Sequence, residues 1–247
     1  MIRRAPHRHG TIVAVRVRRT FAFLDLSGFT ALTATEGDER SVAVLGLFRG
    51  ALRKTCSRRG VRIAKWLGDG AMLVGVETTP VASAALELMC ASELASENVS
   101  VKCGITAGPV ILLEGDDYIG HAVNVAARLC DLAQGGQVLA DPVVVDALPA
   151  WARADGPHGV AVRGVVPLVE IVELSLYCPP GASSPDPVCG IPLAPSTASA
   201  WRSAGSLGRW LFCSDSCLDT WESRPGGRGS GAEPAQGDEA FVRDGIA

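Results

Sequence analysis

Short apolar runs alternate with longer amphipathic stretches along most of the chain. Residues 20–26 form a run rich in Phe and Leu, which predicts a buried strand. Between 28 and 59, apolar residues recur at spacings of three and four, which predicts a helix. Two more apolar runs, 61–67 and 71–76, flank an Asp-Gly turn, and this pattern is typical of a β-hairpin.

The next stretch again alternates helical and extended patterns. We predict a helix over 80–95, strands over 99–107 and 110–113 with a Gly-Pro turn between them, and a helix over 121–133. Short strands are expected further on, around Val138, Val160 and Val169. The order β-α-β-β-α-β indicates an α+β fold, a ferredoxin-like sandwich of one mainly antiparallel sheet with helices on one face.

Composition divides the chain into five parts. Residues 1–19 form an arginine-rich arm, and residues 20–176 hold the α+β pattern. Pro, Gly and Ser dominate residues 177–185, which we interpret as a linker. A compact cysteine-containing module with three tryptophans is expected over 186–225, and the composition of 226–247 predicts a disordered tail.

The bulk composition argues against several classes of protein. A net charge of −3 and a pI near 5.8 disfavour a nucleic-acid binder, and we expect the arginines of the arm to be solvated. No run reaches the roughly 18 apolar residues of a membrane span, and residues 11–17 are too short for the core of a signal peptide. We therefore expect a cytoplasmic protein, whose eight cysteines are thiols or metal ligands.

Two aspartates lie where predicted strands end. Asp25 ends the first strand and Asp69 lies in the hairpin turn. If that strand lies beside the hairpin, both carboxylates emerge at one edge of the sheet, and hard cations such as Mg²⁺ or Mn²⁺ prefer such oxygen ligands. The helix after Asp25 starts near Gly28, Phe29 and Thr30, whose free N–H groups suit phosphate oxygens. Taken singly, each aspartate is better explained as a helix-entry residue or as part of a common turn.

Two polar pairs have spacings that suit a nucleotide. Asn124 and Arg128 are four residues apart and share one face of an otherwise apolar helix, where they suit a ribose and a phosphate, or else form a surface stripe. Lys65 on the hairpin and Asp117 before that helix offer a donor and an acceptor. This pair matches the ring nitrogen and amino group of adenine, whereas guanine presents the reverse pattern. Singly, both are ordinary solvated residues.

Four segments together resemble the class III adenylate and guanylate cyclases. They are FLDLSGFT from position 23, KWLGDG from 65, GITAGPV from 104 and DYIGHAVNVAARL from 117. Their order and approximate spacing over residues 20–175 match the family, and four linked motifs are far more specific than one.

The resemblance implies a role for each of these side chains. The two aspartates become ligands of two Mg²⁺ or Mn²⁺ ions per active site, the Lys–Asp pair reads the base, Asn124 positions the ribose and Arg128 stabilises the transition state. The family's triphosphate-binding Lys is matched by Arg163, which keeps the charge but not the geometry. In the implied reaction the 3′-hydroxyl of ATP attacks the α-phosphorus, giving 3′,5′-cyclic AMP and pyrophosphate. Because the family builds each site from two protomers, a homodimer is expected.

The cysteine-containing module resembles YHS or TRASH-type metal-associated domains in its segments DPVCGI from 186 and WLFCSDSC from 210. Cys189, Cys213 and Cys217 suit Zn²⁺ or another thiophilic ion, but a tetrahedral site needs a fourth ligand. Cys178, an aspartate or an outside ligand can supply it. Buried structural cysteines in a tryptophan-rich core fit the same pattern equally well.

The sequence therefore favours an ATP-using adenylate cyclase that acts in signal transduction. A guanylate cyclase is the second enzymatic hypothesis, and Lys65 argues against it. A catalytically silent cyclase-like domain for dimerisation or nucleotide sensing is the alternative from another class, and the presence of all the expected active-site residues argues against that. A metal sensor with a cyclase output is compatible with the first hypothesis.

Overall fold

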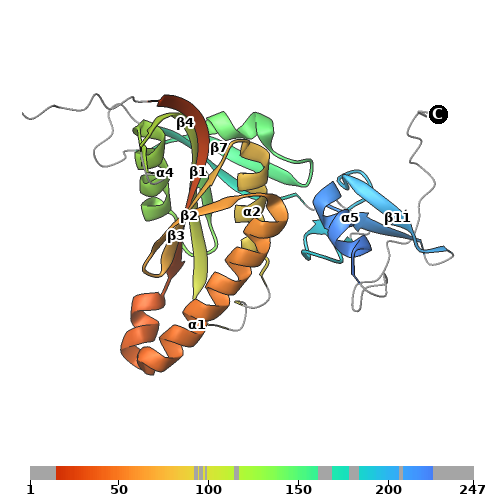
Figure 1. Ribbon diagram of the computed structural model, residues 1–247, viewed down its shortest axis with the longest axis horizontal. Helices are drawn as coiled ribbons and strands as arrows, with labels where there is room; N and C mark the ends of the chain where they lie inside the picture. Colours follow the sequence, from red (N-terminus) through yellow and green to blue (C-terminus); the bar gives the residue numbers. More distant parts are fainter. Residues whose placement is uncertain are drawn as a thin grey trace, which may run out of the picture.

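A computed structural model describes residues 15–91, 94, 97, 99–113, 117–160, 169–177, 184–205 and 208–224. They form an N-terminal domain (residues 15–177) and a C-terminal module (residues 184–224) that lies beside it (Figure 1). Most of the expected arm and linker, the expected tail and Arg163 lie outside the described residues.

One mixed sheet forms the centre of the N-terminal domain. Its strands are β1 Val15–Ser27, β2 Arg62–Leu67, β3 Gly70–Gly75, β4 Ser100–Leu112, β5 Tyr118–Ile119, β6 Val138–Ala140, β7 Ala152–Val160 and β8 Val169–Leu176. They lie in the order β2-β3-β1-β4-β6-β8-β7, and β5 also pairs with β4. β1 and β4 pair antiparallel along their whole length, while β6 runs parallel to β4.

Helices cover both faces of this sheet. Helices α1 (Phe29–Arg59) and α2 (Thr78–Leu88) pack in one core with the even-numbered side chains of β1, such as Leu24. Helix α4 (His121–Leu132) packs in a second core with Phe21, an odd-numbered residue of β1. Figure 1 shows α4 on one side of the strands and α1 with α2 on the other.

The expected arrangement of helices on one face is therefore wrong. The run at 20–26 is apolar at almost every position rather than at every second one, so both faces of β1 are buried. β4 meets α4 closely at Gly104, where a Cβ would overlap Cys130 N and Ala126 O and would lie 2.7 Å from the carbonyl carbon of Leu129.

Four element boundaries also differ from the expectation. β1 begins at Val15, so residues 15–19 of the expected arm belong to the central sheet. β4 is one strand rather than two, because Gly108 and Pro109 stay paired opposite Arg19 and Arg18 of β1. The missing N–H of Pro109 lies where β4 has neither β5 nor β6 beside it, which is where a strand tolerates proline. Helix α1 breaks at Gly37, whose φ of 81° is non-helical, and α2 ends at Leu88.

The remaining elements confirm the α+β prediction. The β2–β3 hairpin, α4 and β6 form where the apolar pattern places them, while β7 ends at Val160 and β8 begins at Val169, the two positions around which strands were expected. No helix in the described ranges has both the length and the apolar character needed to cross a membrane.

The C-terminal module consists of two small sheets and one helix. Its elements are β9 Ser184–Pro185, β10 Pro192–Leu193, β11 Ala200–Ser203, β12 Arg209–Phe212 and α5 Asp215–Glu222. β9 pairs with β10, so the two residues that we assigned to the end of the linker belong to the module. The module's buried residues join the larger core of the N-terminal domain, and Trp151 Nε1 donates a hydrogen bond across the junction to Cys213 O at 3.1 Å.

The contact at Gly104 generates a stability prediction. Gly104→Ala should lower the free energy of unfolding by about 1–3 kcal/mol or more, because the added methyl group must push α4 away from β4. Denaturant unfolding measures this. Gly46→Ala in α1 is the matched control, since no atom lies within 4 Å of its Cβ position, and it should leave stability unchanged or raise it by up to about 1 kcal/mol. Equal stabilities for the two variants would contradict the close approach.

Candidate active site

The two aspartates of the first motifs come together at one end of the sheet. Asp25 lies in β1, where its neighbour Leu24 pairs with Ala71 of β3, and Asp69 lies in the turn that enters β3. Between them, a Cβ at Gly70 would lie 2.6 Å from Leu24 O and 3.2 Å from Asp25 Oδ1, so glycine is what lets the turn approach β1. The two carboxylates lie near each other, as expected, because the turn at Gly70 packs closely against β1.

A lysine that the sequence reading missed sits beside this pair. Lys102 is directly opposite Asp25 in the β1–β4 ladder, and its Nζ lies 3.1 Å from Asp25 Oδ2. Burial, followed by the charge of Asp25, raises the pKa of Asp69 above its ordinary value. Two adjacent carboxylates suit a hard divalent cation, with which the ammonium group of Lys102 competes for Asp25. In the sequence, Lys102 could have been recognised as a site residue because it is a charged residue between the apolar strand residues Val101 and Cys103.

The start of α1 follows directly after Asp25. Gly28 has a φ of 91° and precedes the first helical residue, Phe29, and no side chain caps this helix end. The first N–H groups of a helix have no intrahelical partner, so those of Phe29 and Thr30 are available to anionic oxygens.

The expected base-reading residues contact each other. Lys65 in β2 forms an ion pair with Asp117, and about half of each side chain is exposed. Because half of each side chain is exposed, the pair can meet a flat polar ring from solvent.

Asn124 and Arg128, the polar pair of α4, lie apart from the two aspartates. Asn124 and Arg128 occupy the exposed side of α4, whereas Ala126 and Leu129 face the sheet and are fully buried. Arg128 Nη1 lies 2.9 Å from Asp131 Oδ2, one turn further along the same helix. Because the body of α4 separates this surface from the sheet, one chain does not bring Asn124 or Arg128 to Asp25.

Curated relatives of this sequence include adenylate cyclases, while no protein-family model matches it. An adenylate cyclase of Glutamicibacter nicotianae is 31% identical over 150 residues, which are 59% of this chain and 36% of that protein. The pH-sensitive adenylate cyclase MT1302 of Mycobacterium tuberculosis is 31% identical over 137 residues, 56% of this chain and 34% of that protein. The uncharacterized protein Rv2212 of the same species is 37% identical over 136 residues, 55% of this chain and 36% of that protein. The chain thus spans about a third of the length of these relatives.

Solved cyclase structures share the architecture. The adenylyl cyclase CyaB from P. aeruginosa is similar with a TM-score of 0.55 and 22% identity, over 65% of this chain and 95% of that one. The guanylyl cyclase Cya2 is similar with a TM-score of 0.56 and 21% identity, over 68% of this chain and 97% of that one. The catalytic core of a rhodopsin-guanylyl cyclase is similar with a TM-score of 0.60 and 18% identity, over 66% of this chain and 98% of that one. The fold is that of adenylyl and guanylyl cyclase catalytic domains. Relatives and fold together support a class III cyclase domain, without choosing between the two nucleotides.

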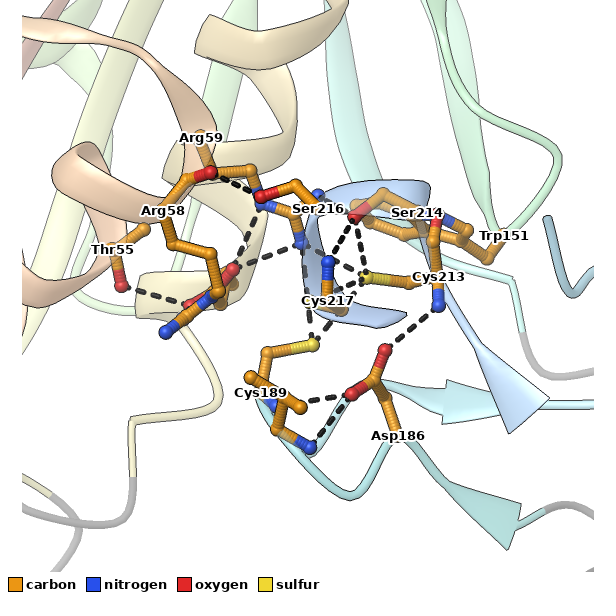
Figure 2. Close-up of polar contacts among 12 residues, drawn as sticks. Thr55, Arg58, Arg59, Trp151, Asp186, Cys189, Cys213, Ser214, Ser216 and Cys217 are labelled. Carbon is orange, nitrogen blue, oxygen red and sulfur yellow. Dashed lines mark hydrogen bonds and ion pairs between the residues drawn. The ribbon is translucent and has the colours of Figure 1, made fainter. Parts of the chain in front are cut away.

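Beyond the cyclase fold, the three expected metal-binding cysteines gather in the C-terminal module. Cys189 follows β9, Cys213 directly follows β12 and Cys217 lies in α5, and Figure 2 shows these three residues together. Asp186 completes the group, and its ligand oxygen and the three sulfurs all lie within 4.8 Å of one another. The sequence left the fourth ligand open among Cys178, an aspartate and an outside group. Cys178 lies outside the described residues, and the position of Asp186 depends on a turn that only the fold reveals.

The environment of this group alters several pKa values. Hydrogen bonds from Cys189 and then Cys213 lower the pKa of the Cys217 thiol to about 4. Burial, and then the charge of Cys213, raises the pKa of Asp186 to about 6. Burial alone would lower the pKa of Arg59, but the negative charges of Cys213 and Glu87 raise it above its ordinary value.

Glu87 of α2 joins helices α1 and α2 at this junction. Its side chain is 5% exposed and accepts from Thr55 Oγ1 at 2.9 Å, from Arg59 Nε at 2.9 Å and from Arg58. The buried guanidinium groups of Arg58 and Arg59 therefore share Glu87 as their carboxylate partner.

This dependence generates the second prediction. Glu87→Ala should lower the free energy of unfolding by about 3–5 kcal/mol, because it leaves Arg58 and Arg59 buried without their carboxylate partner. Denaturant unfolding is again the measurement. Glu36→Ala is the control, since Glu36 pairs with Arg40 on the surface, where a pair contributes only about 0–1 kcal/mol. Losses of similar size in both variants would show that the buried pairing does not stabilise the junction.

Proposed function

We propose that this protein is an adenylate cyclase that converts ATP to 3′,5′-cyclic AMP and pyrophosphate at the interface of a homodimer. The observation that carries the proposal is the placement of the site residues. The two carboxylates meet at one end of the sheet, while Asn124 and Arg128 lie on the far surface of α4. A site that needs both sets is complete only when a second chain presents its α4 surface.

Each side chain then has a task that its surroundings support. Asp25 and Asp69 hold two Mg²⁺ or Mn²⁺ ions, which when bound lower the pKa of the attacking hydroxyl and neutralise developing charge. The N–H groups after Gly28 bind phosphate oxygens. Arg128 of the opposite chain stabilises charge on the transferred phosphorus, and Asn124 positions the ribose. The triphosphate role of Arg163 remains a prediction from the sequence.

The Lys65–Asp117 pair favours ATP over GTP. Lys65 donates to the adenine ring nitrogen, and Asp117 accepts from the amino group. The names of the curated relatives agree with this choice, whereas the structural neighbours include enzymes for both nucleotides. We place the reaction in the cytoplasm, where ATP and Mg²⁺ are available and thiols stay reduced.

Lys65→Glu should lower kcat/KM for ATP and raise the GTP-to-ATP ratio of kcat/KM. The adenine nitrogen loses its donor, which costs about 1–3 kcal/mol, while a carboxylate accepts from guanine. Steady-state assays with both nucleotides and Mn²⁺ measure the ratio. Lys54→Glu makes the same charge change on α1 and should leave the ratio unaltered. If Lys65→Glu also leaves it unaltered, the base-reading role is wrong.

Complementation tests the shared site. Asp25→Ala and Arg128→Ala should each be nearly inactive alone, because each variant damages both sites of its own dimer. In a mixed dimer both defects fall in one site and the other site is intact. Random pairing makes half the dimers mixed, so an equal mixture should recover about a quarter of wild-type activity.

The control for complementation is Asp155→Ala, which removes an exposed carboxylate of β7 and should retain full activity. Proven mixed dimers without recovery would mean that each site is built within one chain. Absence of cyclic product from the wild-type protein with either nucleotide would favour the silent, nucleotide-sensing alternative.

A further inference from the structure

The spacing of the sulfurs in the C-terminal module suits a metal ion. Cys213 Sγ lies 3.5 Å from Cys189 Sγ and 3.6 Å from Cys217 Sγ. A tetrahedral Zn²⁺ with Zn–S bonds of about 2.3 Å places its sulfur ligands about 3.8 Å apart. The three sulfurs therefore need only small shifts to hold an ion between them.

Asp186 retains room for a fourth bond. Its Oδ1 accepts from Val188 N at 2.8 Å and Cys189 N at 3.2 Å, and its Oδ2 accepts from Cys213 N at 2.7 Å. A carboxylate has about four acceptor positions, so one stays available on Oδ2. The three N–H bonds also fix the carboxylate toward the sulfurs, as Figure 2 shows. An oxygen donor beside three sulfurs suits Zn²⁺ better than Cu(I).

The charge of such a site needs a partner, and the N-terminal domain supplies it. Three thiolates and one carboxylate carry four negative charges, of which a divalent ion removes two. A buried excess of negative charge is costly unless a cation lies nearby. Arg59 Nη2 is 3.1 Å from Cys213 Sγ, and its side chain is 5% exposed. Donors to a bound ligand are the usual outer shell of a metal site.

The position of Arg59 links the module to the cyclase fold. Arg59 is the last residue of α1, whose first turn follows Asp25. After Gly60, with a φ of 65°, the chain enters β2, which carries Lys65 and leads to Asp69. Arg59 therefore stands at the joint between the two elements that flank the proposed nucleotide site.

We propose that the four donors of the module bind one Zn²⁺ ion and that Arg59, from the other domain, is the ion's outer-sphere partner. The ion then fastens the module to the α1–β2 joint. By the reciprocity of coupled equilibria, docking through Arg59 strengthens ion binding by the same factor by which the ion strengthens docking. The inference goes beyond the proposed cyclase activity and does not depend on it.

Zinc affinity of the full-length, reduced protein tests the coupling, measured by competition with a chromogenic chelator. Wild type should bind one Zn²⁺ per chain. Arg59→Met should weaken binding about tenfold or more, the usual cost of losing an outer-shell partner. Arg58→Met is the matched control, because Arg58 pairs with the same Glu87 and is 7% exposed. It should bind Zn²⁺ nearly as wild type does.

Two further measurements keep the test decisive if Arg59→Met folds poorly. In wild type, Zn²⁺ should slow hydrogen exchange of the amides of residues 55–61 at the end of α1. Asp186→Asn should weaken Zn²⁺ binding, whereas Asp219→Asn, on the exposed side of α5, should not.

Several outcomes would overturn the proposal. Reduced wild-type protein that binds no Zn²⁺ would leave the cysteines as structural residues. Unchanged affinity in Arg59→Met would remove the coupling, and tighter binding would mean that Arg59 competes with the ion. Unchanged exchange at 55–61 on adding Zn²⁺ would show that the ion does not reach the N-terminal domain.

Discussion

The long antiparallel pairing of β1 with β4 is the constraint on which the rest of the structure depends. Thirteen residues of each strand form one continuous ladder at the centre of the sheet. The central parts of both strands are buried on both faces, so helices cover each face. Gly104 lets α4 approach the backbone of β4, and the same ladder places Lys102 opposite Asp25.

The two-sided packing has a consequence for chemistry. α1 starts beside Asp25, and the turn carrying Asp69 reaches the same end of the sheet through the close approach at Gly70. α4 uses its inner side to cover the sheet and has only its outer side left for polar residues. A helix buried on one side cannot present the same residues to the sheet and to solvent, and this division supports a site assembled from two chains.

The junction with the C-terminal module contains buried charges as well as the shared apolar core. Glu87 lies between two arginines on one side, a group of thiols and Asp186 lies on the other, and Arg59 contacts both. Burying such groups is favourable only when each charge has a partner. Arg59 therefore stabilises the junction through both groups, and the sequence pattern of α1, a helix with two arginines in its last turn, does not reveal this.

The sequence by itself determined the α+β class, most strand and helix positions, and the residues of the cyclase-like motifs, because these follow from local periodicity and short linked segments. Only the tertiary structure decided what depends on contacts between distant segments. It put helices on both faces, kept Gly108 and Pro109 within one strand, set Lys102 beside Asp25, and brought Asp186 and Arg59 to the cysteines. A run of apolar residues shows that a strand is buried, but not what buries it. Likewise, the partner of a charged side chain is chosen by three-dimensional packing, which sequence spacing does not record.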